Sequence, residues 1–195
     1  LRRRLDPSDP RLTVVIGQYG RALHYNAHYD EAESVLHEAE ARWYAEGPGG
    51  TAWIPMGLAD VLHSRGKFTE AEAVLRRADA TQRRVGSPDV AKAELARELG
   101  SVLRDRGRIA EGLEMQRNAL AQMQRVLGNS HGSTAATHAQ FARTLALAGE
   151  TGQSRAQASA ASGVLNRRFG AHHAAIGINR HTLALADELD GNTEA

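Results

Sequence analysis

One stretch of this sequence recurs at nearly constant spacing along the whole chain. It reads NAHYDEAESVLHEAE from Asn26, RGKFTEAEAVLRRAD from Arg65, RGRIAEGLEMQRNAL from Arg106 and AGETGQSRAQASAAS from Ala148. The residues at its turn are Ala27, Gly66, Gly107 and Gly149. They are separated by 39, 41 and 42 positions, and one more step of 42 leads to Gly191. Such a period indicates a stack of similar supersecondary units, each of which needs its neighbours to bury an apolar face.

Large and small residues alternate at fixed positions before each turn. Eight residues before it stand Tyr19, Leu58, Leu99, Phe141 and Leu183, and each is followed by Gly or Ala. Four residues before it stand Leu23, Leu62, Leu103 and Leu145. Closely packed helices need this alternation. We therefore expect each copy to form a hairpin, with helix A before the turn and helix B after it.

Each turn carries the chemistry that ends one helix and starts the next. Gly66 is expected to close its helix in the left-handed conformation that glycine adopts without steric cost, with Lys67 in a solvated corner. Thr69 and Glu72 have the spacing of a capping box, which would start the next helix at Thr69. These signals predict an all-α chain with helices over residues 10–26, 30–46, 51–64, 69–85, 88–106, 110–127, 133–148, 152–169 and 173–189.

The repeat divides almost the whole chain. We expect a lead-in at 1–9, a helical array at 10–190 and a tail at 191–195. The chain starts with Leu rather than Met and stops where another B helix would follow, so we interpret it as one region of a larger protein. Within the array, the predicted repeats cover 10–50, 51–87, 88–130, 131–172 and, in part, 173–190.

The composition argues against several classes of partner. The 24 Lys and Arg residues balance 23 Asp and Glu residues, so no overall field attracts nucleic acid or an anionic membrane. The absence of cysteine removes disulfides and thiolate metal sites, and no apolar run approaches the roughly 18 residues of a membrane span. These features favour a cytoplasmic protein. The abundance of Ala and Arg is typical of a GC-rich bacterial gene.

The corner around Gly66 and Lys67 also invites a nucleotide-binding interpretation. A phosphate-binding loop reads G-x-x-x-x-G-K-[ST]. Here Val61 takes the place of the first glycine, and Phe68 takes the place of the Ser or Thr. A shallow helical groove also does not shield a reaction from water. We therefore expect no enzymatic activity, no catalytic residue and no cofactor in this chain.

Nine histidines suggest a metal site, with two candidate pairs. His24 and His28 are four residues apart, and His172 and His173 are adjacent. A site needs three or four ligands, and neither pair has an obvious third. We interpret these histidines as structural or surface residues and expect no metal. Scattered arginine pairs without interleaved aromatic residues likewise argue against a nucleic-acid surface.

The ensemble of these patterns resembles the tetratricopeptide-repeat family, in particular the long repeats of about 42 residues found in kinesin light chains and many bacterial regulators. The corner GKFTEAE resembles that family, as do the connectors RVLGNSH and RRFGAHH, although the fourth corner, GETGQSR, lacks the usual aromatic residue and alanine. The resemblance covers nearly the whole chain. It implies a right-handed α–α superhelix of about four helical hairpins plus a terminal A helix. The large–small pairs and B-helix alanines that carry it are Leu58 with Ala59, Leu99 with Gly100, Ala78 and Ala119.

The resemblance also implies a partner-binding groove, because family members usually capture a protein or peptide on the inner surface of their A helices. Four arginines against one aspartate would make this lining basic and suited to an acidic segment or a free carboxyl terminus. The alternative is that these are ordinary solvated helix residues. The Lys-x-x-x-Asn pair with which some members clamp chaperone tails is absent from the matching positions. The predicted groove residues are Gln18, Arg21, Tyr25, Met56, Asp60, His63, Arg97, Ser101, Arg104, Gln140, Arg143 and His181.

We therefore expect a non-enzymatic protein-binding or peptide-binding module, the interaction or sensor region of a larger regulatory protein. Two alternatives stay open. The last helix, with Leu183, Leu185 and Leu189, could pair with a second copy and make the chain a dimerising scaffold. Relatives of this repeat type accompany kinase and nucleotide-binding regulatory domains, so the chain could instead be the non-catalytic arm of a multidomain enzyme. No nucleic-acid or membrane partner is expected.

Overall fold

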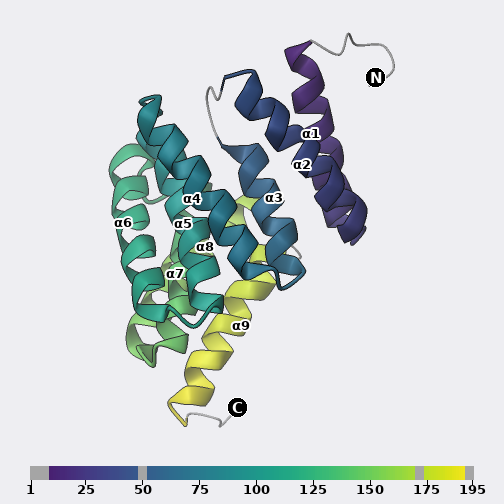
Figure 1. The fold of residues 1–195 in the computed structure, drawn as a ribbon. Coiled ribbons are helices and arrows are strands. Elements are labelled where there is room, and N and C mark those ends of the chain that lie inside the picture. Colours follow the sequence, from purple (N-terminus) through teal and green to yellow (C-terminus); the bar gives the residue numbers. More distant parts are fainter. Residues whose placement is uncertain (1–8, 48–51, 170–173, 192–195) are drawn as a thin grey trace. The chain divides into compact units, whose positions relative to one another are not determined.

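The computed structural model describes residues 9–47, 52–169 and 174–191 (Figure 1). Every regular element in these ranges is an α-helix, so the all-α prediction is confirmed, and each helix begins and ends within two residues of its predicted bounds. No helix in the described ranges is both long and apolar enough to cross a membrane. The helices are α1 (Pro10–Tyr25), α2 (Tyr29–Ala45), α3 (Trp53–Ser64), α4 (Phe68–Arg84), α5 (Asp89–Asp105), α6 (Ile109–Leu127), α7 (Gly132–Leu147), α8 (Thr151–Phe169) and α9 (Ala174–Leu189).

The four corners between A and B helices share one hydrogen-bonding pattern. The residue after the turn donates its backbone N–H to the carbonyl of the recurring leucine, which satisfies one of the last carbonyls of helix A. The turn residue has a positive φ, with values of 74° at Gly66, as predicted, and 60° at Ala27, for which it was not predicted. The four donor–acceptor pairs are His28 to Leu23 (3.0 Å), Lys67 to Leu62 (2.8 Å), Arg108 to Leu103 (2.9 Å) and Glu150 to Leu145 (2.9 Å).

The predicted capping box at Thr69 and Glu72 is wrong. Helix α4 begins one residue earlier, at Phe68, and its N-cap residue, Lys67, makes no side-chain capping bond. The ring of Phe68 lies against His63, with 5.2 Å between the ring centroids. The Glu72 carboxylate accepts a hydrogen bond from Arg76 Nε (2.7 Å). We attribute the earlier start of α4 to the aromatic contact across the corner.

Lys67 is not the freely solvated corner residue that was predicted. Its Nζ lies 2.7 Å from Oε1 of Glu33, and Nη1 of Arg65 lies 2.7 Å from Oε2 of the same carboxylate. Because Glu33 belongs to α2, these ion pairs join the first hairpin to the corner of the second.

The chain divides into two compact units, residues 1–95 and 96–195, and α5 spans the division. In the first unit, α2 packs against α1 and α3, and α3 packs against α4. Two glycines of α1 make room for large side chains. A Cβ on Gly20 would lie 2.6 Å from Cγ of Leu36, and a Cβ on Gly17 would lie 2.7 Å from Cη2 of Trp53. The largest side chains buried in this unit are Ile16, Leu36, Ile54, Leu58, Leu62, Leu75, Leu95 and Gln82.

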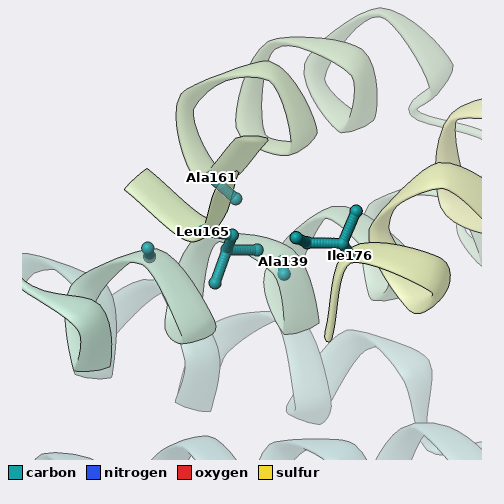
Figure 2. Close-up of a cluster of buried hydrophobic side chains, with 5 residues drawn as sticks. Ala139, Ala161, Leu165 and Ile176 are labelled. Atoms are coloured by element: carbon teal, nitrogen blue, oxygen red, sulfur yellow. The ribbon is translucent and has the colours of Figure 1, made fainter. Parts of the chain in front are cut away.

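In the second unit, α7 packs against α6, α8 and α9. Figure 2 shows the cluster where α7, α8 and α9 meet, with Ile176 of α9 directed toward Ala139 and Leu165. The small alanines of α7 and α8 let the three helices approach closely. This cluster consists of Ala135, Ala139, Ala161, Leu165 and Ile176, with Val164 beside it. A second cluster joins α6 to α7 through Leu113, Leu120, Phe141 and Leu145.

Two residues of the predicted large-residue column are incompletely buried. Leu58, Leu99 and Phe141 are at most 4% exposed, whereas Tyr19 is 47% exposed and Leu183 is half-buried. Tyr19 and Leu183 lie in the first and last helices, where the described chain provides a neighbouring hairpin on one side alone. Burial of this column therefore depends on a neighbour on each side, as expected for stacked repeats.

Candidate partner-binding surfaces

Six predicted groove residues lie in the first unit, on α1 and α3. Their exposure decreases from Tyr25, which is 74% exposed, to Arg21, Met56 and His63, which are half-buried. Gln18 and Asp60 are exposed. The open part of this surface is therefore aromatic and polar rather than uniformly basic.

Arg21 is held in place by aromatic rings. Its guanidinium carbon lies 5.8 Å from the ring centroid of Tyr25 and 5.9 Å from that of Trp53, and its Nη2 donates a hydrogen bond to the Tyr25 hydroxyl (3.0 Å). Gly57 lets the stem of the side chain pass, because a Cβ there would lie 3.3 Å from Arg21 Cγ. Within the described part of the chain, no carboxylate lies within ion-pair distance of this guanidinium. Arg21 is thus an ordered cation without a counterion among the described residues.

In the second unit, two predicted groove arginines of α5 are neutralised by the residues next to them in sequence. Nη2 of Arg97 lies 2.5 Å from Oε1 of Glu98. Arg104 donates two hydrogen bonds to Asp105, of 2.7 and 2.8 Å, and its side chain is 1% exposed. These internal pairs remove much of the positive charge that the sequence predicted for the groove.

The uncharged predicted groove residues of the second unit differ in accessibility. Ser101 is buried, and its hydroxyl accepts a hydrogen bond from Gln116 Nε2 (3.2 Å). Gln140 is half-buried, and its Oε1 accepts a hydrogen bond from Arg104 Nη1 (3.5 Å). His181 is exposed on α9. Ser101 is thus engaged by the chain itself, whereas His181 is open to a partner.

Arg143 is the remaining predicted arginine, half-buried on α7. Burial lowers the pKa of its guanidinium, and the positive charge of Arg104 lowers this pKa further, whereas Asp105 opposes the shift. Both carboxylate oxygens of Asp105 are already hydrogen-bonded to Arg104. No carboxylate of the described residues lies within ion-pair distance of Arg143. An arginine stays protonated in proteins, so Arg143 is a partly desolvated cation that forms no ion pair among the described residues.

Exposed apolar side chains on α7 and α9 were not among the predicted groove residues. Leu147 and Ile178 are each 43% exposed, Leu189 is 54% exposed, and Leu185 is half-buried. The sequence did carry a signal for two of them. One 42-residue step from Arg143 leads to Leu185, and the same step from Leu147 leads to Leu189. Positions that are inner-facing in one repeat are expected to be inner-facing in the next.

Of the two candidate metal-binding histidine pairs, only His24 and His28 lie within the described residues. Nε2 of His24 lies 3.0 Å from the Ser64 hydroxyl, and the His24 ring lies 5.9 Å from the Tyr25 ring and 5.8 Å from the Tyr29 ring, measured between centroids. His28 is the N-cap residue of α2. His172 and His173 lie outside the described residues. Where the structure describes the chain, it brings no three His, Asp or Glu side chains together in a way that could hold a metal ion.

The segment GNSHG at residues 128–132 matches the G-x-S-x-G spelling of a nucleophile elbow, which our sequence interpretation missed. Such an elbow joins a strand to a helix and exposes its serine at the top of a sheet. Here the segment joins helix α6 to helix α7. Nδ1 of His131 accepts a hydrogen bond from the backbone N–H of Ser133 (3.1 Å) and caps α7. The match therefore reflects helix capping rather than an esterase-like site.

Comparison with known proteins shows which proteins share this architecture. Residues 89–162 match the family model described as Tetratricopeptide repeat. No curated protein sequence matches the chain significantly. Among solved structures, a putative kinesin light chain from Podosopora anserina with nearly identical TPR-like repeats is 18% identical, with 95% of this chain and 90% of that chain covered and a TM-score of 0.71. A point variant of the same protein, also 18% identical, gives 92% and 86% coverage with a TM-score of 0.69.

A third similar structure is BtubC (BKLC) from P. vanneervenii, which is 14% identical over 97% of this chain and 68% of that chain, with a TM-score of 0.61. At these identities the likeness concerns the fold alone. The predicted resemblance is confirmed by the family match together with the shared fold. Residues 89–162 thus match the tetratricopeptide repeat, and the chain has the helical-repeat fold of kinesin-light-chain-like tetratricopeptide proteins.

Proposed function

We propose that this chain is a non-enzymatic protein-binding module that takes an acidic or carboxylate-bearing segment of its partner on the inner face of its A helices. The repeat fold is that of protein-interaction scaffolds in general. The main support for acidic specificity is that the four predicted arginines differ in whether they are paired with a carboxylate. Arg97 and Arg104 are paired with Glu98 and Asp105, whereas Arg21 and Arg143 are ordered without a carboxylate among the described residues.

Ordered arginines without counterions are suited to binding carboxylates. A guanidinium presents a planar fork that matches a carboxylate through two parallel hydrogen bonds. The side chain of Arg21 is already positioned by Tyr25, so little further conformational freedom is lost on binding. Arg143 is partly shielded from water, which strengthens its attraction for an anion relative to a fully solvated arginine. Each unit thus offers one such cation by itself.

The module would serve a larger regulatory protein, with the binding surface acting as its docking or sensor region in the cytoplasm. This proposal rests on the usual role of the repeat family and on the nearly neutral overall charge of the chain, which is +1. A neutral protein with local cations selects partners through local contacts, because no long-range field draws anions to it indiscriminately.

Selection of peptides from a random library displayed on phage, with the purified chain as bait, tests the proposal and does not require the natural partner to be identified. We expect the enriched peptides to contain more Asp and Glu than the starting library. The double variant Arg21→Gln with Arg143→Gln should lose that enrichment. Arg117→Gln, at an exposed arginine of α6, is the matched control and should retain it. Enrichment without acidic residues, or no enrichment at all, would contradict the acidic specificity.

A further inference from the structure

The inner positions of α7 and α9 combine one cation with several apolar side chains. On α7, Arg143 and Leu147 are four residues apart and therefore lie on the same side of the helix. On α9, Ile178, Leu185 and Leu189 are spaced by seven and four residues, so they form one stripe along the helix. Leu147, Ile178 and Leu189 are between 43% and 54% exposed.

The contacts of Ile176 and Asp187 lie on the side of α9 away from this stripe. The opposite edge of α9 faces α8, where Arg155 Nη1 binds Asp187 (3.1 Å) and the Ala186 carbonyl (3.1 Å). Ile176 packs into the cluster formed by α7 and α8 (Figure 2). The helices α7 and α9 are in contact, and Leu185 and Leu189 occupy in α9 the repeat positions that Arg143 and Leu147 occupy in α7. We therefore expect these four side chains to lie on one surface.

The last helix also differs from α7 on the face that would receive a following B helix. The residues of α7 that occupy this face include His138, Ala142 and Ala146, all of which are buried. One step of 42 residues along, α9 carries Arg180, Ala184 and Glu188; Arg180 and Glu188 are charged, and none of the three is buried. The apolar stripe of α9 is therefore distinct from this face, which is mostly charged.

We propose that α7 and α9 form a binding surface for a peptide segment in which apolar side chains flank a single carboxylate. Arg143 pairs with the carboxylate, and Leu147, Ile178, Leu185 and Leu189 contact the apolar side chains. This inference rests on the proposed function and adds to it the apolar half of the partner's chemistry. It is argued from charge complementarity: Arg143 forms no ion pair with a carboxylate among the described residues, and the exposed side chains of the stripe are apolar.

The surface follows the usual logic of protein recognition. Burial of exposed leucine and isoleucine side chains supplies most of the binding free energy. The apolar contacts exclude water around the ion pair, which strengthens it, and a wrong residue opposite Arg143 would leave a desolvated charge unpaired. An apolar peptide without the carboxylate would therefore bind weakly, and an acidic peptide without apolar residues would gain little from the stripe.

Fluorescence polarisation tests the inference with the tightest-binding acidic peptide from the library selection. Its apolar residues are replaced by Ser in one derivative, and its acidic residues by Gln in another. We expect both derivatives to bind the wild-type chain about tenfold or more weakly, because each loses one half of the recognition. Leu189→Ser and Leu185→Ser should weaken the parent peptide by a similar factor, while Val126→Ser, at a 47%-exposed position of α6, should leave it unchanged.

The outcomes separate the two proposals. If the Ser derivative binds as tightly as the parent, the apolar half of the surface is wrong while the acidic specificity stands. If the Gln derivative binds as tightly as the parent, the acidic specificity itself is wrong. Sedimentation velocity identifies the other possible occupant: a wild-type dimer that Leu189→Ser converts to a monomer would show that a second copy covers the stripe, and would overturn the inference. Because Leu189 lies at the end of α9 and is 54% exposed, its replacement is expected to preserve the fold.

Discussion

A Cβ on Gly112 would lie 2.7 Å from the carbonyl oxygen of Gly100, so α5 and α6 approach each other where neither residue has a side chain. The obstacle is backbone, which cannot rotate away as the end of a flexible side chain can. We predict that Gly112→Ala lowers the free energy of unfolding by up to about 2 kcal/mol, because the steric cost of about 1–3 kcal/mol outweighs the helix-propensity gain of about 1 kcal/mol. Urea denaturation followed by circular dichroism measures the change.

Gly163→Ala is the matched control for this prediction. Gly163 lies inside α8 and is exposed, and the nearest atom to an added Cβ is Nη1 of the flexible Arg167 side chain, at 3.5 Å. The same substitution should therefore raise the free energy of unfolding by about 0.5–1 kcal/mol. Equal effects of the two substitutions would show that the contact between α5 and α6 is not the cause.

Ala27 occupies a corner position where the other repeats have glycine. Its φ is 60°, in the region that disfavours residues with a side chain, whereas Gly66 has a φ of 74° at the equivalent corner. Replacing Ala27 by Gly removes backbone strain of about 1–2 kcal/mol from the folded protein. It also makes the unfolded chain more flexible, which lowers the stability of the folded protein by about 0.4–1 kcal/mol. We predict a net stabilisation of about 0.5–1 kcal/mol, measured by urea denaturation. The reverse change, Gly66→Ala, should destabilise the protein, and a stabilising result there would refute the explanation.

Glu33 links α2 to the corner that follows α3. Burial by itself would raise the pKa of its carboxyl, but the hydrogen bond from Lys67 and the charges of Lys67 and Arg65 outweigh it and the pKa is lowered. A lowered carboxyl pKa means that the stabilisation is present above the ordinary Glu range and is lost as the pH falls through the folded-state value. We predict that Glu33→Gln lowers stability at neutral pH by about 0.5–1 kcal/mol, with a smaller difference from wild type in acid. Chemical denaturation at both pH values measures this, and a difference that grows in acid would contradict it.

The sequence predicted the helices well because the same local device recurs at each corner. Leu62 and Gly66 are four residues apart, as are their counterparts in the other copies, and this spacing alone locates the end of helix A and the start of helix B. The burial of Leu58 and Leu99 followed from the same register. These features depend on local and nearest-neighbour packing, which a periodic sequence reports directly.

The candidate site was less predictable because charge pairing depends on rotamers. Arg97 and Arg143 look equivalent as groove arginines in the sequence, yet Arg97 turns to its neighbour Glu98, whereas Arg143 has no acidic residue beside it in the chain. The aromatic support of Arg21 by Trp53 joins residues from different hairpins and has no local signature. Nor does the sequence reveal that the Arg104 side chain is buried and forms an ion pair with Asp105.

His24 provides a test of how the first hairpin is joined to α3. Burial lowers the pKa of its imidazole, and the charge of Arg21 adds to the effect. Because the unfolded chain has the ordinary pKa of about 6.5, it takes up a proton before the folded protein does as the pH falls, so stability decreases on acidification through this range.

His24→Gln keeps a side chain that can hydrogen-bond Ser64 but does not titrate. We predict that the variant loses less stability than wild type when urea denaturation is compared at about pH 7.5 and about pH 5.5. His181→Gln, at an exposed position of α9, controls for the removal of one imidazole. Equal protection by the two variants would show that the environment of His24 is not responsible.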